Sequence, residues 1–341
     1  MTGLTLDEVT VRHEGPGGAV TAVDRVSLAV PEGATVGLVG ESGSGKSSLA
    51  RAVVGLSPLS GGRLWIDGHE VRSRTVGDRR RLGQRVQMVF QDPDTALDPR
   101  MTVRQTLAEA AGAFRRLDGR ARERRIAELL DLVGLDARLG DRLPRELSGG
   151  QRQRVALARA LAVGPGILIA DEITSALDVS VQAAVLTTVR DLQRRLGLSM
   201  LFISHNLAAV RYVSDVIAVM YLGRIVETAP AERLLADPQH PYTRTLLAAV
   251  PSLHEPLRTG EPQLSGEAPD PSAPPGGCRF HPRCPVGPSR HPERTICAQR
   301  DPQPGADGRP HLAACHFPSS AGPAPQPPPT TPTTPTTPNG R

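Results

Sequence analysis

The sequence predicts an α/β fold with a mainly parallel sheet, a helical insertion and a separate C-terminal segment. Short strand-like runs alternate with amphipathic helical runs through most of residues 3–255, a pattern typical of parallel sheets covered by helices. A glycine-rich turn joins a buried strand to a helix, and residues 95–160 have helical periodicity alone. All four cysteines lie within residues 276–317, which we expect to form a unit of their own.

The composition is that of an ordinary globular protein. Of 341 residues, 39% are hydrophobic and 22% charged, and the net charge is +5 at pH 7. The arginines interleave with acidic residues, which favours solvated helix faces over a nucleic-acid surface. No apolar run approaches the roughly 20 residues that cross a bilayer, and the start lacks a secretory signal pattern. We therefore expect a cytoplasmic protein whose membrane role comes through a partner.

Hydrophobic periodicity assigns the elements in chain order. Strands at residues 3–12 and 20–30 alternate apolar and polar positions, whereas the strand at 33–40 is a continuous buried run. Further strands are predicted at 62–68, 85–90, 166–171 and 199–204, and a hairpin at 216–227. Helices are predicted from residue 46 and at 102–114, 120–135, 149–163 and 180–197.

Residues 40–47, GESGSGKS, fit the phosphate-loop pattern G-x-x-x-x-G-K-[ST] between a strand and a helix. Such a loop turns backbone N–H groups toward phosphate oxygens, aided by the partial positive charge of the helix N-terminus. Lys46 is the only lysine among 40 basic residues, and a slim ammonium reaches phosphates where a planar guanidinium is too wide. We expect Ser47 to hold Mg²⁺. The predicted nucleotide ligands are Gly40, Ser42, Gly43, Ser44, Gly45, Lys46, Ser47 and Ser48.

Two further motifs narrow the class of nucleotide-binding protein. Residues 147–151 read LSGGQ directly before a helix, and residues 167–172 read ILIADE, a buried strand ending in two carboxylates. With these motifs, residues 3–255 resemble the nucleotide-binding subunit of ATP-binding cassette (ABC) transporters. The resemblance implies a P-loop ABC domain with a small antiparallel β subdomain, an ATPase activity and a two-subunit sandwich around two ATP molecules.

The same resemblance implies roles for the motif residues. Asp171 would hold Mg²⁺ and Glu172 would polarise the attacking water. Gln91 of FQDP matches the glutamine loop, which contacts Mg²⁺ or water, and His205 of FISHN matches the switch histidine, which binds the γ-phosphate. Residues that would act across the dimer interface are Ser148, Gly149, Gly150 and Gln151 of the signature and Asp178 of SALD.

Two positions depart from the family pattern. His13 stands where the family usually has an aromatic residue that stacks on adenine, and its smaller ring can still stack. Ile173 replaces the proline of the usual D-E-P sequence. Because both carboxylates before Ile173 survive, we expect hydrolysis to survive, with a less rigid turn.

Residues 91–103 and 237–251 resemble segments of peptide-permease ATPases. This resemblance implies ATP-driven import of oligopeptides or dipeptides, with nickel or another small solute as the alternative cargo. It implies a heterodimer with a second ABC ATPase, two transmembrane permease subunits and an extracytoplasmic peptide-binding protein, with no nucleic acid. The chain would lie peripherally on the cytoplasmic face of the cell membrane. A largely regulatory ATP-binding subunit is a second alternative.

The cysteines are Cys278, Cys284, Cys297 and Cys315. Because cytosolic proteins rarely keep structural disulfides, four thiols in a small segment suggest a bound metal that stabilises the segment. The segment resembles the C-terminal extension of peptide-permease ATPases, where such cysteines can hold a [4Fe–4S] cluster. Zn²⁺ and no bound metal stay open, with His281, His311 and His316 as possible zinc ligands. The predicted domains are 1–255, 256–317 and a disordered Pro/Thr-rich tail at 318–341.

Overall fold

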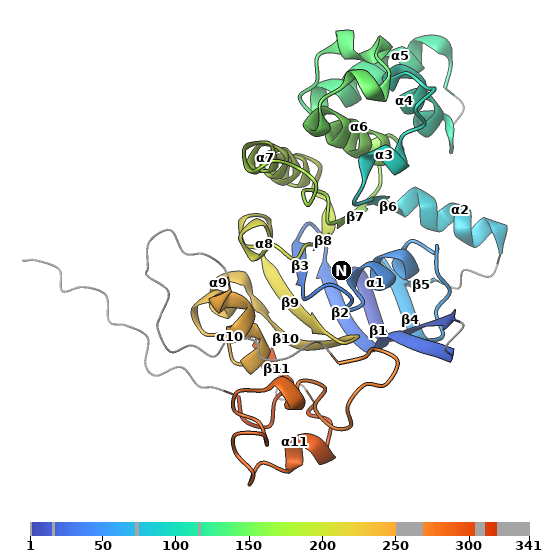
Figure 1. Ribbon diagram of the computed structural model, residues 1–341. Helices are drawn as coiled ribbons and strands as arrows, with labels where there is room; N and C mark the ends of the chain where they lie inside the picture. The colour runs from blue at the N-terminus through green and yellow to red at the C-terminus, as the bar shows by residue number, and fades with distance from the viewer. Residues whose placement is uncertain are drawn as a thin grey trace, which may run out of the picture.

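The computed structural model describes residues 2–15, 18–71, 75–114, 117–249, 269–303 and 311–318. Its centre is a seven-stranded sheet, with a four-stranded antiparallel sheet beside it (Figure 1). The order of the large sheet is β11 (Leu312–Ala313), β10 (Arg224–Pro230), β9 (Val216–Tyr221), β3 (Thr35–Val39), β8 (Ser199–Ile203), β7 (Ile167–Asp171), β6 (Val86–Val89). The predicted α/β class with a small antiparallel subdomain is confirmed.

The five strands from β9 to β6 run parallel, so their carboxyl ends share one edge of the sheet. Every residue of β3, β7 and β8 is buried, as their continuous apolar sequences predict. The phosphate loop follows β3, the acidic pair ends β7, and His205 and Gln91 follow β8 and β6. The sheet therefore gathers four sequence motifs at one edge.

The antiparallel sheet has the order β2 (Gly18–Pro31), β1 (Thr2–Gly15), β4 (Gly61–Ile66), β5 (His69–Glu70). Its first two strands are longer than the predicted 3–12 and 20–30. One face packs with α1 (Lys46–Val53) and β3 in a shared apolar core that includes Val9, Leu38 and Leu49. This packing places α1, and the loop before it, between the two sheets (Figure 1).

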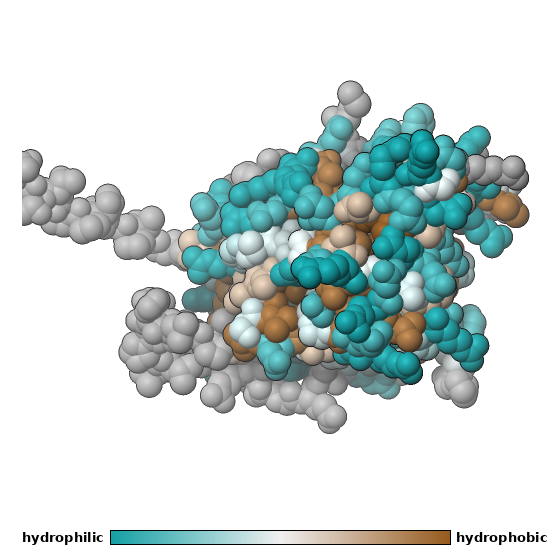
Figure 2. All heavy atoms as spheres, turned by 90° about the horizontal axis from the view of Figure 1, so that it is seen from above, coloured by the Kyte–Doolittle hydropathy of each residue, from teal (hydrophilic) through white to brown (hydrophobic). Residues whose placement is uncertain are grey.

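The helical insertion predicted at 95–160 is present and lies beyond β6 and β7 (Figure 1). It contains α3 (Pro93–Ala96), α4 (Val103–Gly112), α5 (Gly119–Leu132), the 3₁₀ turns η1 (Ala137–Asp141) and η2 (Pro144–Glu146), and α6 (Gly149–Leu161). Thr102 and Asp118 cap α4 and α5, and Leu107, Leu129 and Leu157 are buried. The face seen from above is mostly hydrophilic, with small groups of apolar residues (Figure 2).

The long helix α7 (Val179–Leu196) agrees with the predicted 180–197, but several shorter helices lacked a clear sequence signal. These are α2 (Val76–Arg85), α8 (Leu207–Val213), α9 (Ala231–Ala236) and α10 (Pro241–Ala248). Leu82 is the one buried residue of α2, so no apolar stripe marks that helix. Within the described ranges, no helix combines the length and apolarity that crossing a membrane requires.

The C-terminal extension, residues 269–303 and 311–318, packs against the large sheet below its β9–β10 hairpin (Figure 1). It contains η3 (His281–Arg283), α11 (Ile296–Gln299) and β11, which pairs with β10. Phe280 is 1% exposed, and its ring centroid lies 5.3 Å from that of Tyr221 and 5.4 Å from that of Tyr242. The predicted boundary at 255 and the tail beyond 318 lie outside the described residues.

A buried polar cluster joins the same parts of the chain. The carboxylate of Glu227 on β10 accepts hydrogen bonds from the backbone N–H of Gln239, at 2.7 Å, and of His240, at 2.9 Å. His311, next to β11, lies 2.6 Å from the same carboxylate. Separating the extension from β10 would remove His311 from this carboxylate and leave it with only the two backbone N–H groups.

We predict that Phe280→Ala releases the extension from the sheet. The substitution removes a fully buried ring from an aromatic cluster, which costs about 3 kcal/mol or more of unfolding free energy. Limited proteolysis and denaturant unfolding of the full chain measure this loss. The control is Phe317→Ala in the same extension, where the side chain is 37% exposed. Equal resistance to protease in Phe280→Ala and the wild type would contradict the prediction.

We also predict that acid weakens the packing around His240. Burial lowers the pKa of His240 from 6.5 to about 3, so between these pH values the unfolded chain binds the extra proton. Stability is therefore lost as pH falls below 6.5, by up to about 1.4 kcal/mol per pH unit. His240→Asn keeps an acceptor for the Tyr242 N–H at the start of α10 and should flatten this dependence. Urea unfolding at pH 7.5, 6.5 and 5.5 compares the two proteins; parallel profiles would refute the role of His240.

Candidate functional site

The phosphate loop owes its shape to glycines that no other residue could replace without strain. Gly43 and Gly45 have φ angles of 77° and 103°, in the left-handed region that glycine adopts freely. A Cβ on Gly45 would lie 2.1 Å from the carbonyl oxygen of Ala22 on β2. The loop therefore sits tightly between β2 and the start of α1, as the motif predicted.

Lys46 points into this loop and is 4% exposed. Its Nζ donates to the carbonyl oxygens of Gly40 and Glu41, both at 2.9 Å, and to Ser44 Oγ at 3.3 Å. Burial lowers the pKa of Lys46, and the nearby carboxylates of Glu172 and Asp171 partly oppose that shift. The only lysine side chain of the sequence is thus held within the loop, where bound phosphates would meet it.

Ser47 and Asp171 come together from α1 and β7. The Ser47 hydroxyl donates to Asp171 Oδ1 at 3.1 Å, and Asp171 is 4% exposed. Burial raises the pKa of Asp171, while the hydrogen bond from Ser47 opposes the rise. A hydroxyl oxygen and a carboxylate oxygen are both ligands that Mg²⁺ prefers, and here they lie beside a phosphate loop. These residues fit the predicted magnesium site.

Glu172 occupies an unusual backbone position. Its φ of 48° is left-handed, which costs about 1–2 kcal/mol for a residue with a Cβ. A backbone hydrogen bond from its N–H to the carbonyl oxygen of Ile203 at 2.9 Å holds it there. Glu172 Oε2 lies 3.3 Å from His205 Nδ1, and the Glu172 side chain is 15% exposed. The two predicted catalytic groups therefore face each other across β7 and β8.

Gln91 and His13 flank this centre. Gln91 Nε2 lies 3.5 Å from Ser175 Oγ, and that hydroxyl donates to the carbonyl oxygen of Glu172 at 2.9 Å. His13, near the end of β1, has Nε2 3.0 Å from Ser48 Oγ on α1. Gln91 is thus connected to the turn after β7, and the His13 ring lies beside the helix that begins at the phosphate loop.

The signature residues belong to a different part of the molecule. Ser148 caps α6 by accepting from the Gln151 N–H at 3.3 Å, and the Gln151 side chain accepts from the Ser148 N–H at 2.9 Å. A Cβ on Gly150 would lie 2.6 Å from Val181 Cγ1, so α6 and α7 approach closely there. Figure 1 shows α6 in the helical insertion and α1 in the core, so one chain does not bring the signature to its own phosphate loop.

The turn after the acidic pair is fixed by contacts that the sequence did not reveal. Ile173, which stands in place of the proline, is 1% exposed and packs in the core. Gln182 Nε2 donates to the carbonyl oxygens of Thr174 at 2.9 Å and Leu177 at 2.8 Å. Asp178 begins α7 without a hydrogen bond from its side chain to the helix. Packing and Gln182 together supply the order that a proline would give.

Four further residues, in two ion pairs beside the site, were not singled out from the sequence. Asp94 on α3 pairs with Arg152 on α6 at 2.9 Å, tying the segment after Gln91 to the signature helix. On the other side of the phosphate loop, Glu41 pairs with Arg283 of the extension at 3.0 Å. No local sequence pattern marks such pairs, because their partners lie far apart in the chain.

The four cysteines converge on one small pocket of about 10 Å³, between the extension and α10. Burial raises the pKa of each thiol, to about 11 for Cys284 and about 12 for Cys315. Within the described ranges, no three His, Cys, Asp or Glu side chains are arranged to hold one metal ion. The histidines considered for zinc contact other groups: His281 the carbonyl of Cys278, His311 the carboxylate of Glu227, and His316 the carbonyl of Arg300. This arrangement does not fit a single zinc ion.

Sequence comparisons identify the family. The family described as ABC transporter matches residues 23–175, and the one described as oligopeptide/dipeptide transporter, C-terminal region, matches residues 226–289. A probable peptide ABC transporter ATP-binding protein of Sinorhizobium fredii is 46% identical over 300 residues, covering 87% of this chain and 82% of that protein. A putative peptide import ATP-binding protein of Brucella abortus is 48% identical over 277 residues, covering 80% and 82%.

Solved structures give the same result for the fold. A dimeric ATP-binding cassette in a post-hydrolysis state, bound to ADP and Pi, has a TM-score of 0.61 at 27% identity, covering 67% of this chain and 98% of that chain. A part of the CbiONQ ABC transporter complex of Clostridium perfringens has a TM-score of 0.62 at 25% identity, covering 69% and 91%. The chain belongs to the ABC transporter family, as an ATPase subunit of the oligopeptide/dipeptide type.

Proposed function

We propose that this ATPase drives the import of oligopeptides or dipeptides by closing with a second ATPase subunit around ATP. Its relatives are named as peptide import ATP-binding proteins, and a family of oligopeptide/dipeptide transporters matches its C-terminal region. The observation that carries the proposal is the meeting of Lys46, the Ser47–Asp171 pair and the Glu172–His205 pair at one edge of the parallel sheet.

In this proposal the phosphate loop binds the ATP phosphates. Lys46 exchanges the carbonyls of Gly40 and Glu41 for β- and γ-phosphate oxygens, and the loop N–H groups complete the cradle. Ser47 and Asp171 hold Mg²⁺, with Gln91 at the mobile side of the site. Bound Mg²⁺ neutralises phosphate charge and orients the γ-phosphate. The His13 ring stacks on the adenine from the end of β1.

Hydrolysis in this proposal depends on the pair across β7 and β8. Glu172 accepts a hydrogen bond from the attacking water and aligns it with the γ-phosphorus. His205 donates to a γ-phosphate oxygen, and its position 3.3 Å from Glu172 sets the two groups around the same water. The strained backbone of Glu172 fixes the direction of the carboxylate before substrate arrives.

The second subunit in this proposal supplies the missing contacts. Ser148, Gly149 and Gly150 sit at the positive end of the α6 helix, which suits them to a γ-phosphate. Since α6 lies away from its own phosphate loop, we place these residues, with Gln151 and Asp178, against the ATP of the opposite subunit. The dimeric cassette among the solved relatives supports this arrangement. A related but different ATPase would make the dimer a heterodimer.

A groove between the core and the helical insertion suits a helix end from a transmembrane permease subunit. Its volume is about 280 Å³, and its lining includes Val54, Leu56, Met88, Phe90, Phe114 and Ala160. Phe90 directly precedes Gln91, so a permease segment seated there would sense movement of the glutamine loop. This contact would hold the chain peripherally on the cytoplasmic face of the membrane, and an extracytoplasmic peptide-binding protein would deliver the cargo.

For the four cysteines we propose a [4Fe–4S] cluster. Such a cluster spreads four thiolates around a core of several atoms, whereas zinc draws them within one ion's reach. The four cysteines line one pocket, which supports a group shared among them, although the pocket must widen to hold a cluster. The visible absorption of anaerobically purified protein tests this, and a colourless, iron-free protein would refute it.

One prediction of this proposal tests Glu172 as the group that activates water. Glu172→Gln keeps the size and hydrogen-bonding capacity of the side chain but removes its charge, so hydrolysis should fall at least about 100-fold. ATP binding should be retained. Phosphate release by the purified transporter, with the equivalent change made in the sister subunit in turn, measures the effect. Unchanged hydrolysis with both subunits substituted would exclude this role.

Another prediction of this proposal tests Lys46, the only lysine of the sequence. Lys46→Arg should weaken Mg-ATP binding at least about tenfold, because the wider guanidinium does not fit among the loop carbonyls and clashes where phosphates must lie. Titration with a fluorescent ATP analogue measures this in the full chain. The matched control is Arg51→Lys on the exposed side of the same helix, which should bind ATP as the wild type does. Equal affinities for all three proteins would contradict the prediction.

A further inference from the structure

The C-terminal extension reaches the phosphate loop through an arginine that lies beside a cysteine. Arg283, next to Cys284, donates from Nη1 to Glu41 Oε2 at 3.0 Å and to the Tyr221 hydroxyl at 3.3 Å. Its side chain is 8% exposed. Glu41 is the residue after Gly40 in the loop, so this is a direct contact between the cysteine-containing segment and the ATP site.

Glu41 is fixed on three sides. Its side chain pairs with Arg283, its N–H donates to the Tyr242 hydroxyl at 2.9 Å, and its carbonyl oxygen accepts from Lys46 at 2.9 Å. Two of these partners come from residues beyond the central sheet. Because Lys46 must leave the Glu41 carbonyl to bind phosphate, the orientation of this one peptide affects the cost of binding ATP.

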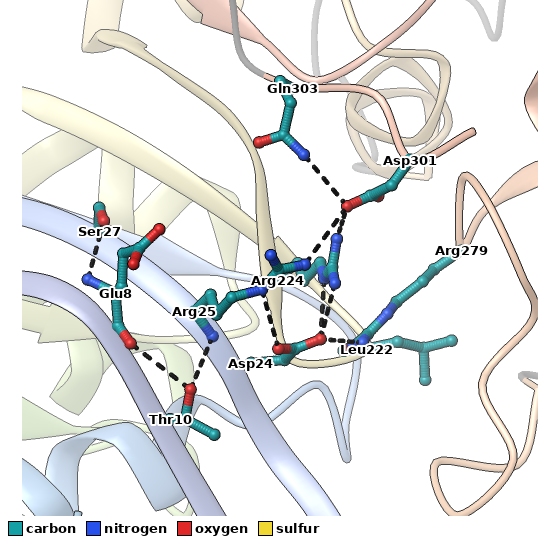
Figure 3. Close-up of polar contacts among 10 residues, drawn as sticks. All are labelled: Glu8, Thr10, Asp24, Arg25, Ser27, Leu222, Arg224, Arg279, Asp301 and Gln303. Atoms are coloured by element: carbon teal, nitrogen blue, oxygen red, sulfur yellow. Dashed lines mark hydrogen bonds and ion pairs between the residues drawn. The ribbon is translucent and has the colours of Figure 1, made fainter. Parts of the chain in front are cut away.

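A second arginine of the same segment supports the opposite side of the loop. Arg279 donates to the carbonyl oxygen of Leu222 and to Asp24 (Figure 3). Gly223, the next residue of that turn, donates its N–H to the carbonyl oxygen of Ser44 at 2.8 Å. The turn between β9 and β10 therefore connects Arg279 to the phosphate loop.

Further ion pairs attach the extension to β10 and β2. Arg224 on β10 pairs with Asp24 at 2.8 Å and also with Asp301 of the extension (Figure 3). Asp24 donates its own N–H to the carbonyl of Gly223 at 2.9 Å. If Arg279 were lost, Arg224 would still hold Asp24, whereas Glu41 has no other cationic side chain against its carboxylate within the described residues. The Arg283 contact is the less redundant of the two.

The Arg283–Glu41 pair is partly buried, with the side chains 8% and 25% exposed, and is incompletely satisfied. Arg283 Nε and Glu41 Oε1 are both shielded from water and lack a hydrogen-bond partner in the described part of the chain. Removing one partner of such a pair leaves a buried charge unpaired, which costs far more than breaking a surface pair. Small movements of the 278–284 segment would therefore be transmitted to the Glu41 side chain.

We propose that Arg283 is a positioning residue for the phosphate loop and couples the cysteine-bearing extension to ATP affinity. The inference rests on the proposed ATP site. Arg283 holds the Glu41 carboxylate, which fixes the orientation of the Glu41 peptide and so keeps the phosphate loop in the shape that accepts phosphates. By thermodynamic linkage, any change at Cys278 or Cys284 that moves Arg283 alters ATP binding, and ATP binding alters that segment equally.

The test uses the full chain and titration with a fluorescent ATP analogue in the presence of Mg²⁺. Arg283→Gln should weaken binding about fivefold or more, since it leaves the Glu41 carboxylate unpaired. Arg283→Lys keeps the charge and should recover part of the affinity. Glu41→Gln changes only the loop side and leaves the extension intact, so it covers the case in which Arg283 variants fold poorly. If the pair acts as a unit, the double variant Arg283→Gln/Glu41→Gln should lose less than the two single losses combined.

Arg294→Gln is the matched control. Arg294 also stabilises the extension, by donating to the Val286 carbonyl at 2.7 Å and lying over the Phe317 ring, and neither contact involves Glu41. Its substitution should leave ATP affinity within about twofold of the wild type. In the assembled ATPase, Arg283→Gln should raise KM for ATP while preserving kcat at saturating ATP, a split expected when binding geometry rather than chemistry is lost.

The outcomes separate this inference from the proposed function. If the wild-type chain does not bind Mg-ATP, the proposed function fails. If the wild type binds and Arg283→Gln and Glu41→Gln bind equally well, only the positioning role of Arg283 is refuted. An equal loss of affinity in Arg294→Gln would also refute it, because the effect would then follow from general loosening of the extension. Additive losses in the double variant would overturn the direct pairing.

Discussion

The whole site depends on one constraint: a buried ammonium held inside a loop that only glycines can form. Lys46 is 4% exposed and bound by two backbone carbonyls, which stabilise a cation that burial alone would disfavour. The left-handed Gly43 and Gly45 turn the chain tightly enough for this. The position of β3 then fixes the loop, and the neighbouring strands bring Asp171, Glu172, His205 and Gln91 to the same edge of the sheet.

The parallel sheet brings residues that are distant in the sequence together in one site. Asp171 and Ile203 are paired in register across β7 and β8, so Glu172 and His205, one or two residues later, necessarily meet. The same logic brings Gln91 from β6 to the turn after Glu172. The signature is placed differently, because it caps α6 in the helical insertion. Its residues can contact an ATP phosphate only when a second subunit brings one to them.

The sequence predicted the parts of the molecule whose signals are local. Buried strands, the glycine loop and the helix that follows Ser148 are encoded within a few residues of each site, and they appear where expected. Polar α2 and the short helices α8 to α10 carry little periodicity, and they were not predicted. Nor could the sequence pair Glu41 with Arg283, because tertiary packing alone joins residues so far apart. The sequence left iron–sulfur and zinc open for the cysteines, and the structure adds only that His281, His311 and His316 contact other groups.

The extension therefore has a physical reason to affect the ATPase. Phe280 anchors it in an aromatic cluster with Tyr221 and Tyr242, and both tyrosine hydroxyls lie at the Arg283–Glu41 pair or the Glu41 N–H. The apolar anchor and the polar contact are thus built from the same side chains. Displacing the extension would remove the ring packing and the support of the loop together. Apolar packing of similar volume is often at least as stabilising as a buried ion pair. An extension attached only for stability would therefore not need Arg283 against the Glu41 carboxylate of the phosphate loop.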